Sequence, residues 1–127
     1  MVNYPIGDFF IRIKNAALAR KQEFVVPYSK TKEEIARVLV KEGYLKSAAK
    51  DKNGQLVVGL AYIGKKPQVT EVKIISKPGL HVYKNAKELK KERNVLGVKI
   101  VATSRGVMTD KEAMKKGVGG EVLTDIY

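Results

Sequence analysis

Residues 98–108, Val-Lys-Ile-Val-Ala-Thr-Ser-Arg-Gly-Val-Met, join an apolar, β-branched run to a polar turn. The first four residues predict a strand, and Gly106 predicts the turn that ends it. A strand end on a packed sheet is a rigid mount for Thr103, Ser104 and Arg105, whose hydroxyls exchange hydrogen bonds and whose guanidinium binds phosphate. This composition suits recognition of a fixed polar partner such as an RNA groove, and it equally suits a plain polar turn between two strands.

The chain around this stretch, residues 65–127, is predicted to be mostly strand. Alternating or β-branched runs predict strands over residues 69–76, 80–83, 96–103 and 121–127. Lys77-Pro78-Gly79 predicts a turn. Thr109 and Glu112 stand at capping-box spacing and predict a short helix that ends at Gly117. The basic stretch 85–93 fits either a short helix or a basic loop.

The first half of the chain has a different pattern, α-β-α-β-β. Helical spacing predicts a helix over residues 5–20, with Pro5 at its first position and Asn3 as its cap. The apolar face of that helix consists of Ile6, Phe9, Phe10, Ile13, Ala16 and Ala17. A strand over residues 23–27 follows, closed by a proline.

A second helix is predicted to open with a capping box of Thr31 and Glu34 and to end at Gly43. Its buried stripe is Ile35, Val38 and Leu39. Strands over 44–50 and 55–62 come next, joined through Asn53-Gly54, a strong hairpin signal. Because the second helix links two strands, those strands are predicted to be parallel neighbours with a right-handed crossover.

The polar stretch Gly64-Lys65-Lys66-Pro67-Gln68 separates these two patterns and is taken as a domain boundary. We therefore predict an N-terminal α/β domain over residues 1–64 and a C-terminal β-rich domain over residues 65–127. The fold class is α+β. The first domain has a three-stranded sheet and two helices, and the second is mainly antiparallel β with one short helix.

The charge of the chain indicates a polyanionic partner. Its 127 residues carry a formal net charge of +12, with a pI near 9.9. The excess is spread over both halves, so it lies on folded faces rather than on a basic tail. Cysteine is absent, and neither a membrane span nor a signal peptide is expected. No membrane partner is expected either.

The sequence argues against an enzyme. The single histidine, His81, alternates with Leu80 and Val82 and has no second histidine with which to share a metal. No phosphate-binding loop or dinucleotide fingerprint is present, and Ser104 has no nearby base in the sequence. We expect no catalytic residues, no metal, no cofactor and no small-molecule substrate.

Common nucleic-acid modules do not fit either, because the RNA-recognition aromatics, the GXXG loop, zinc fingers and the helix-turn-helix are missing. Five blocks in order instead resemble one family, the bacterial small-subunit ribosomal protein eight family (uS8 family). The blocks are Pro5–Ala16, Val26–Lys30, Lys41–Tyr44, Ile75–Tyr83, and Thr103–Asp110 followed by Gly119-Gly120-Glu121.

This resemblance implies a two-domain α+β protein that binds directly to a helix in the central domain of 16S ribosomal RNA and supports subunit assembly. It implies neighbouring small-subunit ribosomal proteins as further partners, and the cytoplasmic ribosome as the location. In some bacteria such proteins also repress translation of their own operon messenger RNA.

The resemblance also assigns RNA contacts. The main contacts fall on Thr103, Ser104, Arg105 and Gly106, with Tyr83 and Glu121 as companions close to that loop. Lys14 and Lys52 are our candidates for holding phosphates. For Tyr83 a packing role is the open alternative. Glu121 must accept a hydrogen bond from a base or orient Arg105, because a carboxylate otherwise repels RNA.

Three departures from the family pattern stand out. Ala102 occupies a position that is usually serine, and His81 one that is usually arginine. Residues 89–95 lack an expected proline-containing stretch. The alternative function is a basic architectural DNA-binding protein, which would hold any duplex with a wedge or a flexible arm. A repressor of messenger RNA outside the ribosome would use the same surface as the ribosomal protein.

Overall fold

The computed structural model of the chain describes residues 5–92 and 96–127. The contacts divide these into two compact units, Pro5–Thr70 and Glu71–Tyr127. The predicted cap Asn3 and the end of the segment 89–95 lie outside the described residues. The α+β fold class is confirmed. That residues 1–64 and residues 65–127 form two separate domains stays a prediction.

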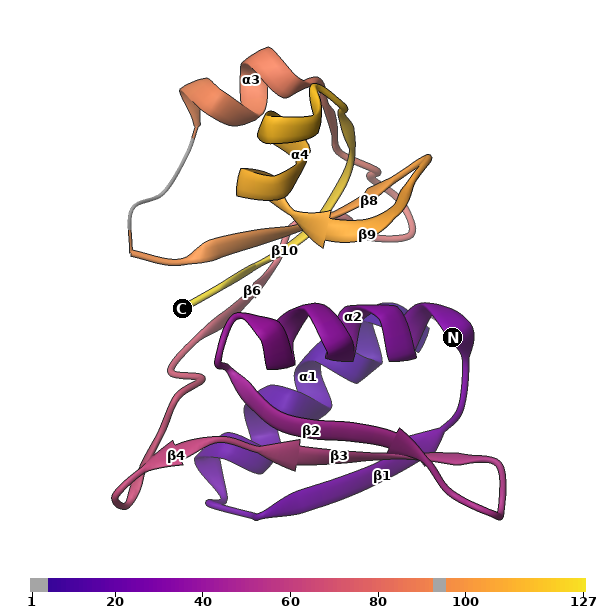
Figure 1. The fold of residues 1–127 in the computed structure, drawn as a ribbon, viewed down its shortest axis with the longest axis vertical. Helices are drawn as coiled ribbons and strands as arrows, with labels where there is room; N and C mark the ends of the chain where they lie inside the picture. Colours follow the sequence, from indigo (N-terminus) through magenta and orange to yellow (C-terminus); the bar gives the residue numbers. More distant parts are fainter. Residues whose placement is uncertain (1–4, 93–95) are drawn as a thin grey trace. The chain divides into compact units, whose positions relative to one another are not determined.

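The unit Pro5–Thr70 packs two helices on one face of a three-stranded sheet (Figure 1). Its elements are α1 (Pro5–Leu18), β1 (Glu23–Pro27), α2 (Lys30–Lys41), β2 (Leu45–Lys50), β3 (Gln55–Leu60) and the short ribbon β4 (Tyr62–Ile63) with β5 (Lys66–Pro67). The first helix ends two residues earlier than predicted, because the chain turns at Arg20, which has φ +55.

The core of this unit forms where α1 meets the sheet. Phe9 is fully buried, and its ring centroid lies 6.2 Å from those of Phe10 and Phe24. The apolar face predicted for α1 is confirmed for Phe9, Phe10, Ile13, Ala16 and Ala17, all of which are buried. In α2 the buried stripe is Ile35, Ala36 and Leu39. Val38, predicted to be buried, is only half-buried.

The predicted pairing of the two strands around α2 is wrong in one respect. The strand order is β1-β3-β2, and both pairings of β3 are antiparallel, so β1 and β2 run the same way but are not neighbours. The reason is the composition of the strands. β3, Gln-Leu-Val-Val-Gly-Leu, is the more apolar and mostly buried, whereas β2 carries exposed lysines. The apolar strand takes the centre, and the polar strand takes an edge.

The caps of α2 also differ from the prediction. Ser29 is the N-cap and its hydroxyl accepts from the Lys32 amide at 3.2 Å, so Thr31 lies inside the first turn and the predicted capping box does not form. At the other end, Tyr44 and Gly43 amides bond back to the carbonyls of Leu39 and Val40, closing the helix as predicted for Gly43. Burial, with the nearby charge of Glu42, raises the pKa of Tyr44.

The β2–β3 hairpin is confirmed, and one side chain organises its turn. The Asp51 carboxylate accepts from the amides of Asn53 at 2.8 Å and Gln55 at 2.9 Å. An aspartate that bonds to amides further along a turn holds the backbone in place without a longer loop. Lys52 lies exposed in this turn.

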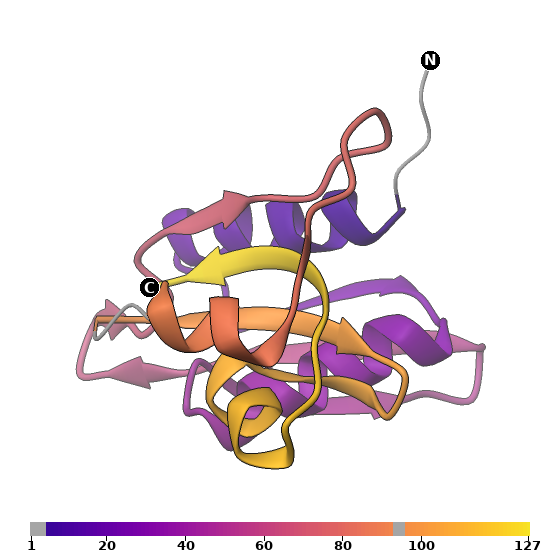
Figure 2. The same ribbon diagram turned by 90° about the horizontal axis from the view of Figure 1, so that it is seen from above.

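The unit Glu71–Tyr127 is a five-stranded antiparallel sheet with two helices on one face (Figure 1). Its described elements are β6 (Val72–Ile74), β7 (Tyr83–Lys84), α3 (Ala86–Lys91), β8 (Val98–Thr103), β9 (Gly106–Thr109), α4 (Asp110–Lys116) and β10 (Gly120–Ile126). The strand order is β6-β10-β8-β9, with β7 also paired to β10. Seen from above, β10 runs between β6 and β8 (Figure 2).

Two predictions for this unit need correction. The basic stretch after residue 85 takes the helical form, one of its two predicted alternatives, with a full capping box of Asn85 and Glu88. The described part of the unit therefore has two short helices, and the fold class with one short helix is wrong in that number. The strand predicted over 80–83 is only Tyr83–Lys84, and Leu80 is 63% exposed at a turn. The predicted turn at Lys77–Gly79 is confirmed by paired backbone bonds between Lys77 and Leu80.

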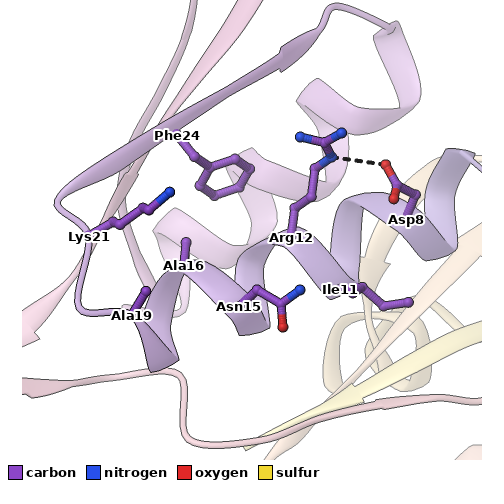
Figure 3. A pocket seen from close by; sticks show the side chains of 8 residues that line it. All are labelled: Asp8, Ile11, Arg12, Asn15, Ala16, Ala19, Lys21 and Phe24. Atoms are coloured by element: carbon purple, nitrogen blue, oxygen red, sulfur yellow. Dashed lines mark hydrogen bonds and ion pairs between the residues drawn. The ribbon is translucent and has the colours of Figure 1, made fainter.

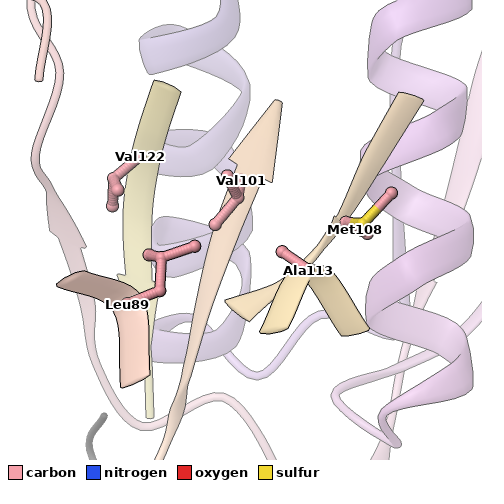
Figure 4. Packing of buried hydrophobic residues seen from close by; sticks show 5 residues of the cluster. All are labelled: Leu89, Val101, Met108, Ala113 and Val122. Atoms are coloured by element: carbon pink, nitrogen blue, oxygen red, sulfur yellow. The ribbon is translucent and has the colours of Figure 1, made fainter. Parts of the chain in front are cut away.

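A compact apolar cluster joins α3 and α4 to the sheet (Figure 4). Its buried members are Leu89, Val101, Met108, Ala113 and Val122. Val101 faces Met108 on one side and Val122 on the other in the strand register. This cluster fixes β8, β9 and β10 as one rigid block at the end of the sheet that carries the β8–β9 turn.

Candidate nucleic-acid interface

The turn between β8 and β9 is held from inside by Thr103. Its hydroxyl donates to the Gly106 carbonyl at 2.8 Å and accepts from the Arg105 amide at 3.1 Å. Gly106 has φ +105, a value that suits glycine, while Ser104 and Arg105 keep negative φ. Ser104 and Arg105 are therefore exposed at the tip of a fixed turn.

The start of β10 fits closely between two strands because residue 120 is a glycine. Gly120 pairs with Thr103 of β8 and with Lys84 of β7. A Cβ built at Gly120 would collide with the Ala102 carbonyl. The missing side chain thus brings β7, β10 and β8 together beside the β8–β9 turn.

The candidate interface includes a row of residues that lie side by side on four neighbouring strands. Tyr83 of β7 pairs with Glu121 of β10, Glu121 pairs with Ala102 of β8, and Ala102 pairs with Val107 of β9. Paired residues point to the same face, and neighbours along a strand alternate. Since residues next to this row pack in the apolar cluster, the row lies on the opposite face of the sheet from α3 and α4.

Tyr83 and Glu121 differ in exposure within this row. Tyr83 is 67% exposed, which leaves most of the residue accessible to a partner and argues against the packing alternative. The Glu121 side chain is 21% exposed and lies beside His81, whose Nδ1 is 2.7 Å from Oε2 of Glu121. The rings of His81 and Tyr83 are 6.5 Å apart.

The His81–Glu121 contact is the feature that sequence reasoning missed. The residues are 40 positions apart, and no local pattern joins them. The only available signal was that His81 occupies a position that is usually arginine in the family it resembles. A strand pairing between β7 and β10 was needed to bring the two side chains together.

The segment that carries His81 is anchored by a buried serine. The Ser76 hydroxyl donates to the Val122 carbonyl at 2.6 Å and accepts from the Val82 amide at 3.0 Å. The Val122 amide in turn donates to the Val82 carbonyl at 2.8 Å. These bonds hold the segment before β7 against β10, so His81 is presented from a fixed backbone.

The structure brings together six of the eight predicted RNA-binding residues at one end of the second sheet. They are Tyr83, Thr103, Ser104, Arg105, Gly106 and Glu121. Lys14 and Lys52 lie in the other unit, Lys14 on α1 and Lys52 in the β2–β3 turn. The RNA-binding role of all eight residues stays a prediction.

The first unit has a polar groove of its own along α1 (Figure 3). It encloses about 470 Å³, and Asp8, Arg12, Asn15, Lys21 and Phe24 are among its lining residues. The Arg12 guanidinium binds the Asp8 carboxylate there at 3.0 Å. This pairing neutralises the arginine locally, so the groove has mixed charge and is not a simple phosphate site.

The acidic side chains of the described residues are dispersed or paired with lysine. Within 5–92 and 96–127 there is no group of three or more His, Asp or Glu side chains placed to hold a metal ion. The largely buried Asp125 carboxylate binds Lys99 at 3.0 Å, and the buried Asp110 accepts from the Lys99 amide. In the same part of the chain, no helix is long and apolar enough to cross a membrane.

Comparison with known proteins gives one family. The chain matches the family Ribosomal protein S8 over residues 4–127. It is 44% identical to the small ribosomal subunit protein uS8 of Thermosynechococcus vestitus, with 99% of this chain and 98% of that protein covered. The uS8 protein of Marinobacter nauticus is 45% identical, over 96% of this chain and 95% of that protein. The uS8 protein of Persephonella marina is 41% identical over the full length of both.

Proposed function

Because this chain belongs to the ribosomal protein S8 family of the small ribosomal subunit, we propose that it binds directly to a helix in the central domain of 16S ribosomal RNA. Through that contact it supports assembly of the subunit. Its role is structural, and it works without a cofactor.

The observation that carries the proposal is the convergence at the β8–β9 turn. The register places Tyr83 and Glu121 in one row with Ala102, next to the turn whose tip exposes Ser104 and Arg105. Regular RNA hides its base edges in a deep groove and offers 2′-hydroxyls and irregular elements in a shallow one. Short hydroxyl side chains and a glycine on a rigid turn approach such a surface closely.

Affinity and specificity come from different residues in this proposal. Arg105 and the phosphate-binding candidates Lys14 and Lys52 supply attraction that weakens with salt. Ser104, Tyr83 and Glu121 supply hydrogen bonds that require matched donors and acceptors on the RNA. The carboxylate of Glu121 indicates what the RNA must present at this point. A carboxylate repels phosphate, so its partner is a hydrogen-bond donor such as a base amino group or a 2′-hydroxyl.

Further parts of the proposal follow from family membership. Neighbouring small-subunit ribosomal proteins are the expected protein partners, and the cytoplasmic ribosome is the expected location. The same RNA-binding surface would serve repression of the protein's own messenger RNA through a hairpin that resembles the ribosomal site. We further propose that residues 65–127 form the RNA-binding domain and residues 1–64 a separate α/β domain.

A binding titration at two salt concentrations tests the main proposal. It compares a central-domain ribosomal RNA helix with a scrambled hairpin of equal length and with duplex DNA of equal size. Preference for the ribosomal helix that survives the higher salt supports the proposal. Equal, salt-sensitive binding to all three would overturn it and favour the architectural DNA-binding alternative.

A further inference from the structure

We propose that His81 is a positioning residue that sets the RNA specificity of this surface by holding the carboxylate of Glu121. The inference rests on the proposed function, and it assigns a role to a side chain outside the eight predicted RNA contacts. Its basis is the 2.7 Å contact between Nδ1 of His81 and Oε2 of Glu121.

The contact fixes a carboxylate that would otherwise rotate. An imidazole with its proton on Nδ1 donates to Oε2, whether the ring is neutral or protonated. Within residues 5–92 and 96–127 the contact with His81 is the one hydrogen bond found for the Glu121 side chain, so its other oxygen, Oε1, is available as an acceptor. An ordered acceptor loses less conformational freedom on binding than a mobile one.

The role is one of recognition rather than of folding. The segment around His81 is already held by the Ser76 hydroxyl and by the backbone bond from Val122 to Val82. The His81 and Glu121 side chains are 49% and 21% exposed, and partly exposed polar contacts of this kind add little to stability. Removing the imidazole therefore leaves the sheet intact and frees the carboxylate.

The second oxygen also explains how the pair discriminates between ligands. A fixed carboxylate repels phosphate and accepts only from donors, so it lowers affinity for any RNA that presents its backbone at this point. The ribosomal helix must offer a donor there, whereas a scrambled helix does so only by chance. His81 thus affects the ratio of specific to nonspecific binding more than binding as a whole.

A double-mutant cycle tests the inference on the full-length chain. The variants are His81→Ala, Glu121→Gln and both together, titrated with the central-domain ribosomal helix and with the scrambled hairpin. We expect His81→Ala to weaken specific binding on the order of tenfold and to leave the scrambled hairpin within about twofold. In the Glu121→Gln background, adding His81→Ala should change neither the affinity for the ribosomal helix nor that for the scrambled hairpin. The melting temperature should be the same for all of these variants.

Two further variants complete the design. His81→Arg keeps a hydrogen-bond donor at this position, so its specific binding should be close to that of the unmodified protein and tighter than that of His81→Ala. Glu92→Gln is the matched control, because Glu92 is a carboxylate of the same unit that forms a partly exposed ion pair with Lys84 at 3.2 Å. That substitution should leave the ratio between the two RNAs unchanged.

Three outcomes with the variants would overturn the inference. Equal weakening of both RNAs by His81→Ala would make His81 a generic contact. An undiminished effect of His81→Ala in the Glu121→Gln background would mean that His81 acts on RNA without the carboxylate. If His81→Ala keeps the full preference for the ribosomal helix, His81 has no role in recognition, although the proposed function still holds. If the unmodified protein itself shows no preference for the ribosomal helix, the proposed function fails, and this inference fails with it.

Discussion

The Thr103 hydroxyl and the Gly106 carbonyl are joined by a 2.8 Å hydrogen bond across the β8–β9 turn. The same hydroxyl accepts from the Arg105 amide. Together the two bonds use the only hydrogen that this hydroxyl can donate and one of its two acceptor lone pairs. Thr103 therefore shapes the turn, and the neighbouring Ser104 is the hydroxyl that remains exposed for a partner.

Thr103→Val should weaken both the turn and RNA binding. It removes two hydrogen bonds at nearly constant shape, so we expect the free energy of unfolding to fall by about 1–2 kcal/mol, together with a loss of specific RNA affinity. Urea denaturation and RNA titration measure the two effects. Thr103→Ser keeps the hydroxyl and is the control. Wild-type binding by Thr103→Val would show that the order of this turn is not needed for recognition.

Ser104→Ala should weaken specific RNA binding and leave stability almost unchanged. The side chain is exposed in the free protein, and loss of a hydrogen bond buried in the complex costs about 1–3 kcal/mol. The measurement is a titration with the central-domain helix. Ser47→Ala, at an exposed position of the edge strand β2, is the control. An unaltered affinity would exclude Ser104 from the site.

Lys14→Ala should reduce the salt dependence of RNA binding without changing RNA preference. Removal of one phosphate contact lowers the slope of log affinity against log salt by about one. The slope is obtained from titrations at several salt concentrations, with Lys30→Ala, an exposed lysine at the start of α2, as the comparison. A changed preference at constant slope would mean that Lys14 reads bases.

Phe9→Ala should destabilise the first unit strongly. Phe9 is fully buried between the rings of Phe10 and Phe24, and truncation of a buried phenylalanine costs about 3–5 kcal/mol. Urea denaturation followed by circular dichroism gives the free energy of unfolding. Ile11→Ala, on the same helix but 47% exposed, should cost far less. Equal effects of the two substitutions would contradict the assigned core face of α1.

Stability should fall at alkaline pH in part through Tyr44. Its pKa is raised by burial and by Glu42, so the folded state holds the phenolic proton more tightly than the unfolded chain does. Stability is then unaffected well below pH 10 and decreases as the pH rises through the unfolded pKa of about 10 and up to the raised folded one. Tyr44→Phe should flatten that decrease when unfolding is followed between pH 8 and 11. An identical alkaline slope would exclude Tyr44 as the titrating group.

Local patterns predicted most individual elements correctly. The helical spacing of α1, the hairpin at Asn53-Gly54 and the helix between Thr109 and Gly117 all form where the sequence indicates. Each depends on residues within a few positions of one another, so backbone preference and side-chain periodicity are enough. The prediction for α2 failed at Thr31 because Ser29 could cap the same turn and lies nearer to the end of β1.

Strand order required the tertiary structure. The sequence contains β1, β2 and β3, yet it does not say that β3 inserts between the other two. That choice depends on which strand buries more apolar surface once all three share a sheet. Similarly, the sequence around Gly120 does not show why a glycine is required there. The requirement arises in the sheet, where Gly120 pairs with Lys84 and a Cβ at this position would collide with the Ala102 carbonyl.

The sequence by itself determined the basic charge, the α+β class, the family and the exposed turn with Ser104 and Arg105. Only the tertiary structure decided that His81 meets Glu121 and that Tyr83, Glu121, Ala102 and Val107 form one row. The physical reason is that charge and periodicity are properties of short segments. A cross-strand row instead depends on register, which the packed cluster of Val101, Met108 and Val122 sets for β8, β9 and β10 together.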